Sequence, residues 1–155
     1  MTTRREFLIL ACGAFPAAAE AQLPPNIAAL RKAALQEALH KVVGGAVLRR
    51  GRVKLDLPPL IDNGNTVPLS VTVESPMTPA DHVKAIHVFT EKNPQPNVVS
   101  VHLGPRAGRA GITTRARIAD SGTVLAIAQM SDGSFWSGSM DVVVTLSACL
   151  EDGLI

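Results

Sequence analysis

The chain has 155 residues, a formal net charge of +2 at pH 7 and only 3% aromatic residues. This length fits one domain, and the mild charge argues against an extended polyanionic partner, so no nucleic-acid binding is expected. Because aromatic residues are scarce, the core has to be built from Val, Leu, Ile and Ala.

The first 21 residues have the features of an export signal. Arg4 and Arg5 precede an apolar stretch at residues 7–19, and "AEA" suits cleavage before Gln22. Paired arginines followed by Phe and Leu favour the twin-arginine type over an ordinary secretory signal. No other stretch approaches the roughly 18 apolar residues of a membrane span. The mature protein is therefore expected in the periplasm, outside the membrane.

Two cysteines occur, one in the signal and one near the C-terminus. Cys12 lies too close to the paired arginines for a lipoprotein site, so Cys149 is the cysteine of the mature chain. It cannot form an internal disulfide in that oxidising compartment. Alternation places Leu146, Ala148 and Leu150 on one face, following Val142 and Val144 on the inward side, and turns Cys149 to the other face. A reactive thiol and an inert, packed one remain equally open from this pattern.

A helix is predicted directly after the signal. Asn26 can cap it, and Gly44–Gly45 can end it. Its apolar positions fall on one stripe: Ile27, Leu30, Ala34, Leu35, Ala38, Leu39 and Val42. The helix has no large aromatic residue to enter lipid, so it is expected to pack on a sheet. Residues 22–50 are interpreted as this helix and a linker.

After Gly51 the apolar residues follow a period of two, except in "TVLAIAQM" and "DVVVTL", which are more uniformly apolar, as central strands can be. Strands are predicted in "VKLDL", "VPLSVTVE", "VVSVHL", "TTRARI", "TVLAIAQM" and "DVVVTL", with turn signals such as "DNGN" and "SDGS" between them. About seven short strands without intervening helices predict an all-β domain over residues 51–147. The expected fold is an immunoglobulin-like antiparallel β-sandwich with an N-terminal α-helix.

Three histidines lie near one another in the predicted sheet. His87 and His102 can approach across a hairpin, but two histidines without an assured third ligand make a weak metal site. The neighbouring pair Asp81–His82 is not a catalytic triad. Structural or surface roles are favoured, and neither a metal nor another cofactor is expected.

Two further features allow a structural and a functional interpretation. "GPRAGRAGITTRAR" carries Arg106, Arg109, Arg115 and Arg117. It lacks the Lys-Ser/Thr ending of a phosphate loop, so it is either an anion-binding or docking patch, or a solvated basic face. Trp136, expected in a loop "FWSGSM", is either a core residue or an anchor on a partner.

Several motifs together resemble the SoxY family of bacterial thiosulfate oxidation. They are "VKLDLPPLIDNGNTVPLSVTVESPMT" at residues 53–78, followed in order by "DHV", "GRAG", "TTRARI" and "MSDGSFW". The resemblance implies an immunoglobulin-like carrier, not an enzyme, that forms a heterodimer with SoxZ. It also implies that a cysteine near the C-terminus, matched by Cys149, holds the sulfur compound covalently. SoxXA, SoxB and SoxCD-type enzymes would then act on it in transient contacts.

The segment 148–155, the cysteine-bearing arm, departs from the family pattern. The family usually ends Gly-Gly-Cys-Gly-Gly, whereas Ser147–Ala148 precede Cys149 here and "LEDGLI" follows it. Glu151 and Asp152 disfavour a thiolate and anionic adducts at this cysteine. Two interpretations stay open: a working sulfur carrier, or a divergent binding module of another periplasmic pathway that pairs with a SoxZ-like protein without carrying sulfur.

Overall fold

The computed structural model describes residues 25–146. The predicted signal at 1–21, Cys12, Cys149 and the arm at 148–155 lie outside these residues. The elements are α1 (Pro25–Val43), β1 (Leu48–Arg50), β2 (Val53–Asp56), β3 (Leu60–Asn63), β4 (Val67–Val73), β5 (Val83–Thr90), β6 (Asn97–His102), β7 (Gly111–Ala116), β8 (Gly122–Met130) and β9 (Phe135–Leu146). In this part of the chain, no helix has the length and apolar character that crossing a membrane requires.

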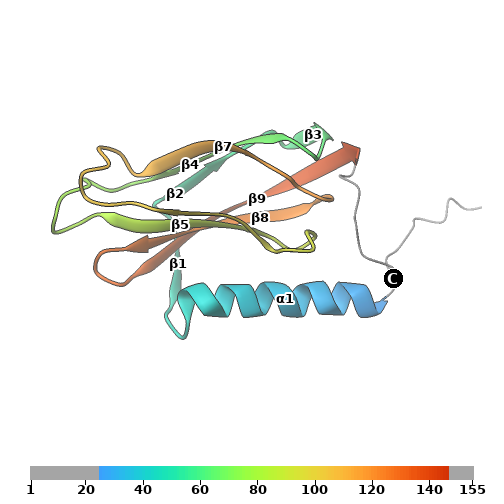
Figure 1. Cartoon of the computed structure of the whole chain (residues 1–155), viewed down its shortest axis with the longest axis horizontal. Helices are drawn as coiled ribbons and strands as arrows, with labels where there is room; N and C mark the ends of the chain where they lie inside the picture. Colours follow the sequence, from blue (N-terminus) through green and yellow to red (C-terminus); the bar gives the residue numbers. More distant parts are fainter. Residues whose placement is uncertain (1–24, 147–155) are drawn as a thin grey trace, which may run out of the picture.

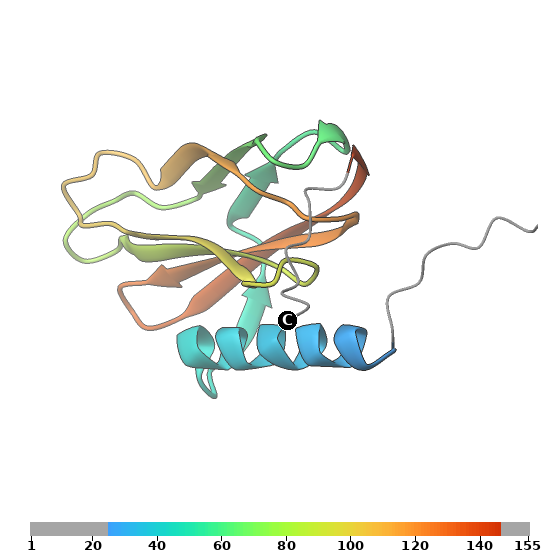
Figure 2. The same ribbon diagram turned by 45° about the vertical axis from the view of Figure 1, so that its right-hand side comes forward.

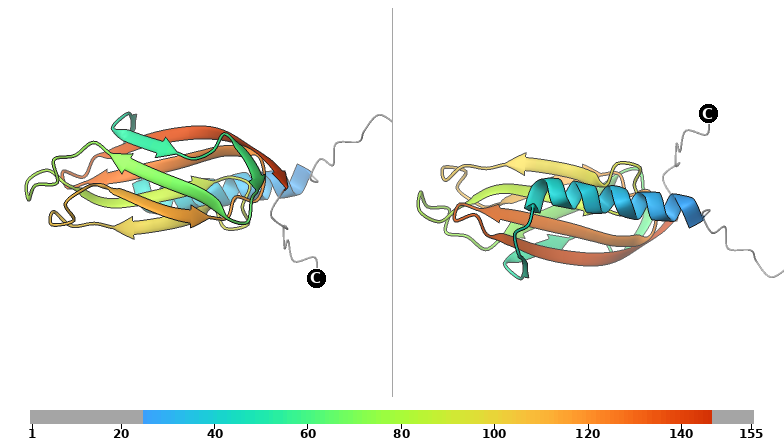
Figure 3. Two further views of the ribbon diagram at one scale, coloured as in Figure 1. Left: turned by 90° about the horizontal axis from the view of Figure 1, so that it is seen from above. Right: turned by 90° about the horizontal axis from the view of Figure 1, so that it is seen from below.

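The strands form two stacked sheets (Figures 1 and 3). The larger sheet has the order β1-β9-β8-β5-β6 with β3 also beside β9, and the smaller has the order β2-β4-β7. Alternate residues of β4, such as Val67, Leu69 and Val71, are buried in the core between the sheets, while their neighbours face outward. Aliphatic side chains dominate this core, as the composition requires. The predicted β-sandwich with an N-terminal helix is confirmed.

The helix covers the outer face of the larger sheet, as Figure 3 shows in the view from below. Its partly buried residues Leu35, Ala38, Leu39, Val42 and Val43 pack against Phe89, Ile127 and Phe135 of the sheet. The helix therefore packs on a sheet as expected.

The C-terminal end of α1 agrees with the prediction, whereas its N-terminal half differs from it. Gly44 ends it as predicted: its φ is 61° and its N–H donates to the His40 carbonyl at 2.8 Å. Asn26 lies within the first turn and its Oδ1 accepts from the Ile27 N–H, so it does not precede the helix as a cap would. Leu30 is 66% exposed, so the prediction that it belongs to the packed stripe is wrong.

The larger sheet contains strands that alternation does not predict. β1 lies in the expected linker, and β1 and β3 both pair with β9 in parallel, so the sandwich is not wholly antiparallel. β5 is buried on both faces because the core covers one side and α1 the other. Residues 135–140, expected as a loop, form the first half of β9. That half passes so close to β2 that a Cβ at Gly138 would clash with the Val53 carbonyl oxygen.

Candidate functional site

The base of the cysteine-bearing arm is the end of β9, at Leu146. β3 holds this end in parallel register, with Asn63 opposite Leu146. The Gly64 N–H donates to the Leu146 carbonyl at 3.1 Å, and the Thr145 hydroxyl donates to the Asp62 carbonyl at 3.2 Å. The ends of β3 and β9 lie together at one end of the sandwich (Figures 1 and 2). The chain is therefore fixed up to three residues before Cys149.

Large apolar side chains near the end of β9 are exposed, and no described residue packs over them. Leu60 is 58% exposed, Val143 56% and Leu146 67%. Val142 and Val144 are buried as alternation predicts, but the prediction that Leu146 faces inward is wrong. Alternation predicts burial only where a second layer covers the strand, and that cover ends before Leu146.

A pocket of about 370 Å³ lies at the same end of the sandwich. It separates the β5–β6 turn from the end of β7. Its lining consists of Asn93, Pro94, Gln95, Asn97, Val98, Arg115, Ala116 and Arg117. We call it the arm-end pocket. Two of the four arginines singled out in the sequence line it.

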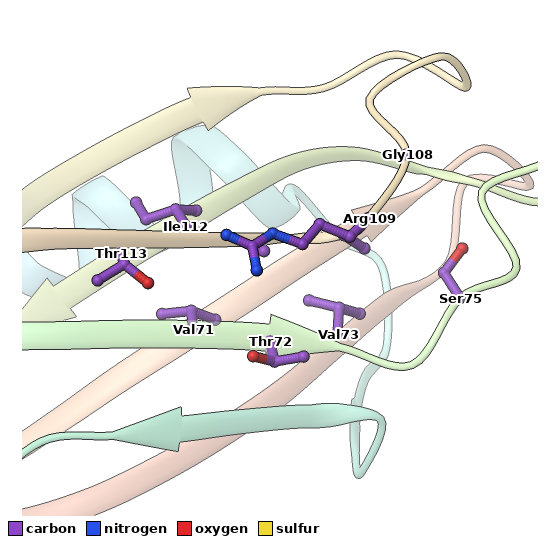
Figure 4. Close-up of a pocket in the computed structure, with 10 residues that line it drawn as sticks. Val71, Thr72, Val73, Ser75, Gly108, Arg109, Ile112 and Thr113 are labelled. Atoms are coloured by element: carbon purple, nitrogen blue, oxygen red, sulfur yellow. The ribbon is translucent and has the colours of Figure 1, made fainter.

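The other two arginines belong to the opposite end of the smaller sheet. Arg109 lines a pocket of about 220 Å³ between β4 and β7, together with Ser75 and Thr113 (Figure 4). Gly111 permits the close strand approach there, since a Cβ would lie 2.9 Å from the Val71 carbonyl oxygen. Arg106 is exposed in the loop before β7. The basic stretch is therefore divided between two ends of the domain.

The histidines meet as predicted but do not make a metal site in residues 25–146. The ring centroids of His87 and His102 lie 6.1 Å apart, and Nδ1 of His87 lies 2.8 Å from the Ser100 hydroxyl. Burial, with a smaller contribution from His102, holds the pKa of His87 below its usual value. No group of three His, Cys, Asp or Glu side chains in this range could hold a metal ion.

Trp136 is a packed residue at the start of β9. The guanidinium carbons of Arg49 and Arg52 lie 5.7 and 5.5 Å from its ring centroid, within the range of cation–π contact. Its indole N–H donates to the Ser134 hydroxyl at 3.2 Å. The structural interpretation of Trp136 therefore accounts for its contacts in the described part of the chain.

The comparisons with known proteins agree on the fold. The chain is similar to the sulfur carrier protein SoxY from Chlorobium limicola f thiosulfatophilum, with a TM-score of 0.62 and 23% identity over 74% of this chain and 99% of that one. It is also similar to superoxide reductase (neelaredoxin) from Ignicoccus hospitalis, with a TM-score of 0.54 and 18% identity over 61% and 80% of the two chains. Superoxide reductase from Nanoarchaeum equitans gives a TM-score of 0.51 and 10% identity over 62% and 100%. At these identities the likeness shows the fold alone. No curated protein matches the chain.

The family model described as "Sulfur oxidation protein SoxY" matches residues 39–149. The match covers most of the chain and runs from the helix to Cys149. The predicted resemblance is confirmed, and with it the prediction of a carrier-family protein rather than an enzyme. This chain belongs to the SoxY family of sulfur oxidation proteins.

Proposed function

We propose that this protein is a covalent carrier that holds sulfur-compound intermediates of thiosulfate oxidation on Cys149. The observation that carries the proposal is the family match, which extends to residue 149, where the cysteine of the mature chain stands. The geometry of β9 supports it. The strand is held at Leu146, so a short segment after a fixed point bears the thiol.

The proposed chemistry makes and breaks bonds at the cysteine sulfur. In loading, Cys149 loses its proton, its sulfur bonds to the outer sulfur of thiosulfate, and two electrons pass to a haem partner of the SoxXA type. Water then attacks the terminal sulfonate, the S–S bond to that group breaks, sulfate leaves, and a persulfide remains on Cys149. This chain supplies the attachment atom, and the partner proteins supply the oxidant and the hydrolytic machinery.

The position of Cys149 limits how such partners can reach the cargo. Three residues of extended chain span at most about 10 Å, so the cysteine stays within that distance of the end of β9. A client enzyme must therefore contact the domain itself. Leu60, Val143 and Leu146 provide an apolar surface at this end for such contact.

Intact-mass analysis of the processed chain purified from periplasm tests the carrier proposal. We expect sulfur-containing adducts that a thiol reductant removes and that are absent from Cys149→Ser. A chain that is always unmodified, with a Cys149 that resists alkylation, would contradict the proposal. The non-glycine arm, with Leu150 and Glu151 after the cysteine, is the feature that would favour the alternative, a binding module without cargo.

The location and the main partner are part of the same proposal. The paired arginines of the signal support export to the periplasm by the twin-arginine route, and family membership supports a heterodimer with SoxZ. Replacing both Arg4 and Arg5 by Lys should retain the precursor in the cytoplasm. Co-expression with SoxZ should give a heterodimer by size-exclusion chromatography, and a chain that remains monomeric beside SoxZ would contradict the pairing.

A further inference from the structure

The arm-end pocket is connected to the base of the arm through backbone hydrogen bonds. The Leu146 carbonyl accepts from the Gly64 N–H at 3.1 Å, and the Gly64 carbonyl accepts from the Ile118 N–H at 2.8 Å. Ile118 directly follows Arg117, which lines the pocket. The end of β9 and the pocket are thus separated by two hydrogen-bonded steps of about 5 Å each.

The pocket presents donors suited to an oxyanion. Arg115 and Arg117 supply guanidinium groups, and Gln95 and Asn97 supply carboxamides. Neither Asp nor Glu is among the described residues that line it. Within residues 25–146, the side chain of Arg115 forms no ion pair or hydrogen bond. Guanidinium groups bind tetrahedral oxyanions through two parallel N–H···O bonds, which places Arg115 among the residue types best suited to such a ligand.

Asn93 holds the two walls of the pocket in place. The residue is 8% exposed, and its side chain donates to the Arg117 carbonyl at 2.8 Å and accepts from the Ala119 N–H at 2.7 Å. The β5–β6 turn is therefore bonded directly to the chain that follows β7. A pocket whose opposite walls are joined in this way keeps its shape before a ligand arrives, which lowers the entropy lost on binding.

We propose that the arm-end pocket binds the terminal sulfonate of the group carried on Cys149. The inference rests on the proposed carrier function and adds an anion site within the same domain. The reach of about 10 Å from Leu146 matches the separation of the pocket, and a short linker raises the effective concentration of the sulfonate to the millimolar range. Arg115 and Arg117 would then offset the repulsion of an anionic adduct by Glu151 and Asp152.

The test compares a charged and an uncharged group on the same sulfur in the full processed chain. Sodium tetrathionate loads Cys149: the thiolate attacks a central sulfur of tetrathionate and forms an S–S bond, while the bond between the two central sulfurs breaks and one thiosulfate dianion leaves. Iodoacetamide gives the uncharged control. In ¹⁵N-labelled protein, we expect the amide signals of Gln95, Asn97 and Val98 to move in the thiosulfonate form and not in the alkylated form.

Two arginine variants show whether the pocket makes the contact. Arg115→Gln should weaken docking about fivefold, the loss of one partly exposed guanidinium–oxyanion contact. Arg106→Gln, an exposed arginine at the other end of β7, is the matched control and should leave the signals unchanged. Equal shifts in the charged and uncharged forms, or equal docking in both variants, would overturn the inference.

Free thiosulfate distinguishes the two sources of the anion. Added to the alkylated chain, it should move the same signals only at millimolar concentration or not at all, whereas the tethered group acts without added ligand. A response to free thiosulfate without a response to the loaded arm would overturn the assignment. Because tetrathionate loading needs no partner enzyme, a missing pocket response leaves the carrier function intact. If the periplasmic protein carries no adducts, the carrier proposal is contradicted, independently of the result for the pocket.

Discussion

Replacing Asn93 by Ala removes two hydrogen bonds that join the β5–β6 turn to the chain after β7. The two backbone partners are affected unequally. The Ala119 N–H is buried, because Ala119 is only 1% exposed, and the variant leaves it without its acceptor. The Arg117 carbonyl belongs to an exposed residue, so water replaces the lost amide donor.

The expected loss of stability follows from this difference. An unsatisfied buried N–H costs about 1–3 kcal/mol, and a hydrogen bond replaced by water costs about 0.5–1 kcal/mol. We therefore expect Asn93→Ala to lower the free energy of unfolding by about 3 kcal/mol. That is a large part of the roughly 5–15 kcal/mol that stabilises a domain.

Urea unfolding, followed by Trp136 fluorescence and circular dichroism, measures this loss. Asn97→Ala is the matched control: among the described residues its side chain bonds to the Ser100 hydroxyl, on an accessible surface, at 3.0 and 3.1 Å, so a loss below about 1 kcal/mol is expected. The reasoning is refuted if Asn93→Ala costs less than about 1 kcal/mol, or no more than the control.

Two further predictions concern the interior of the larger sheet. Gly138→Ala should lower the free energy of unfolding by about 3 kcal/mol, because the new Cβ meets the backbone carbonyl of Val53. Gly104→Ala is the control: no atom lies within 4 Å of its new Cβ, so the free energy of unfolding should change by less than about 0.5 kcal/mol. Similar urea midpoints for the two variants would contradict the packing argument. Burial and the neighbouring His102 lower the pKa of His87 in the folded chain. The contribution of the neutral His87 side chain to the free energy of unfolding is therefore complete above the unfolded pKa of about 6.5, and it is lost as the pH falls through the lower folded pKa. His87→Gln should therefore reduce the fall in urea midpoint between pH 7.5 and pH 5.5, and an unchanged fall would show that His87 is not its source.

Most of the predicted strands have one core face and one solvent face, whereas β8 is predicted from a uniformly apolar run. β4 alternates because the core covers only one of its sides. β5 lacks this alternation because α1 covers its second face. All three residues of β1 are exposed and β3 has a single buried residue, so neither strand shows a period of two. Both short strands depend on parallel pairing with β9, a contact between distant segments that local pattern does not contain.

The start of β9 shows a second limit of local pattern. Ser and Gly residues in "FWSGSM" suggested a loop. In the fold these small residues allow close contacts: Gly138 lies against the backbone of Val53, and the Ser137 hydroxyl donates to the Arg49 carbonyl at 3.2 Å. These positions need small residues because the backbones of Val53 and Arg49 lie close to them, and only folding brings those segments together.

The two parts of the candidate site come from different sources. Cys149 stays a prediction from family motifs and its place near the C-terminus, and it lies outside residues 25–146. The arm-end pocket was not predicted, because its walls come from separate stretches around Asn93 and Arg115. The basic stretch reads as one patch in the sequence, but Arg109 precedes β7 and Arg115 lies near the end of that strand, so the two arginines belong to different ends of the smaller sheet.

The position of β9 also has a mechanical consequence. The strand has β8 along one side, and on the other β1 pairs near its start and β3 near its end. A pulling force on its C-terminal end acts along the strand axis. The tension is then shared by many transverse backbone hydrogen bonds rather than opening them one after another. The end of β9 therefore resists such a force better than a strand whose hydrogen bonds open in sequence.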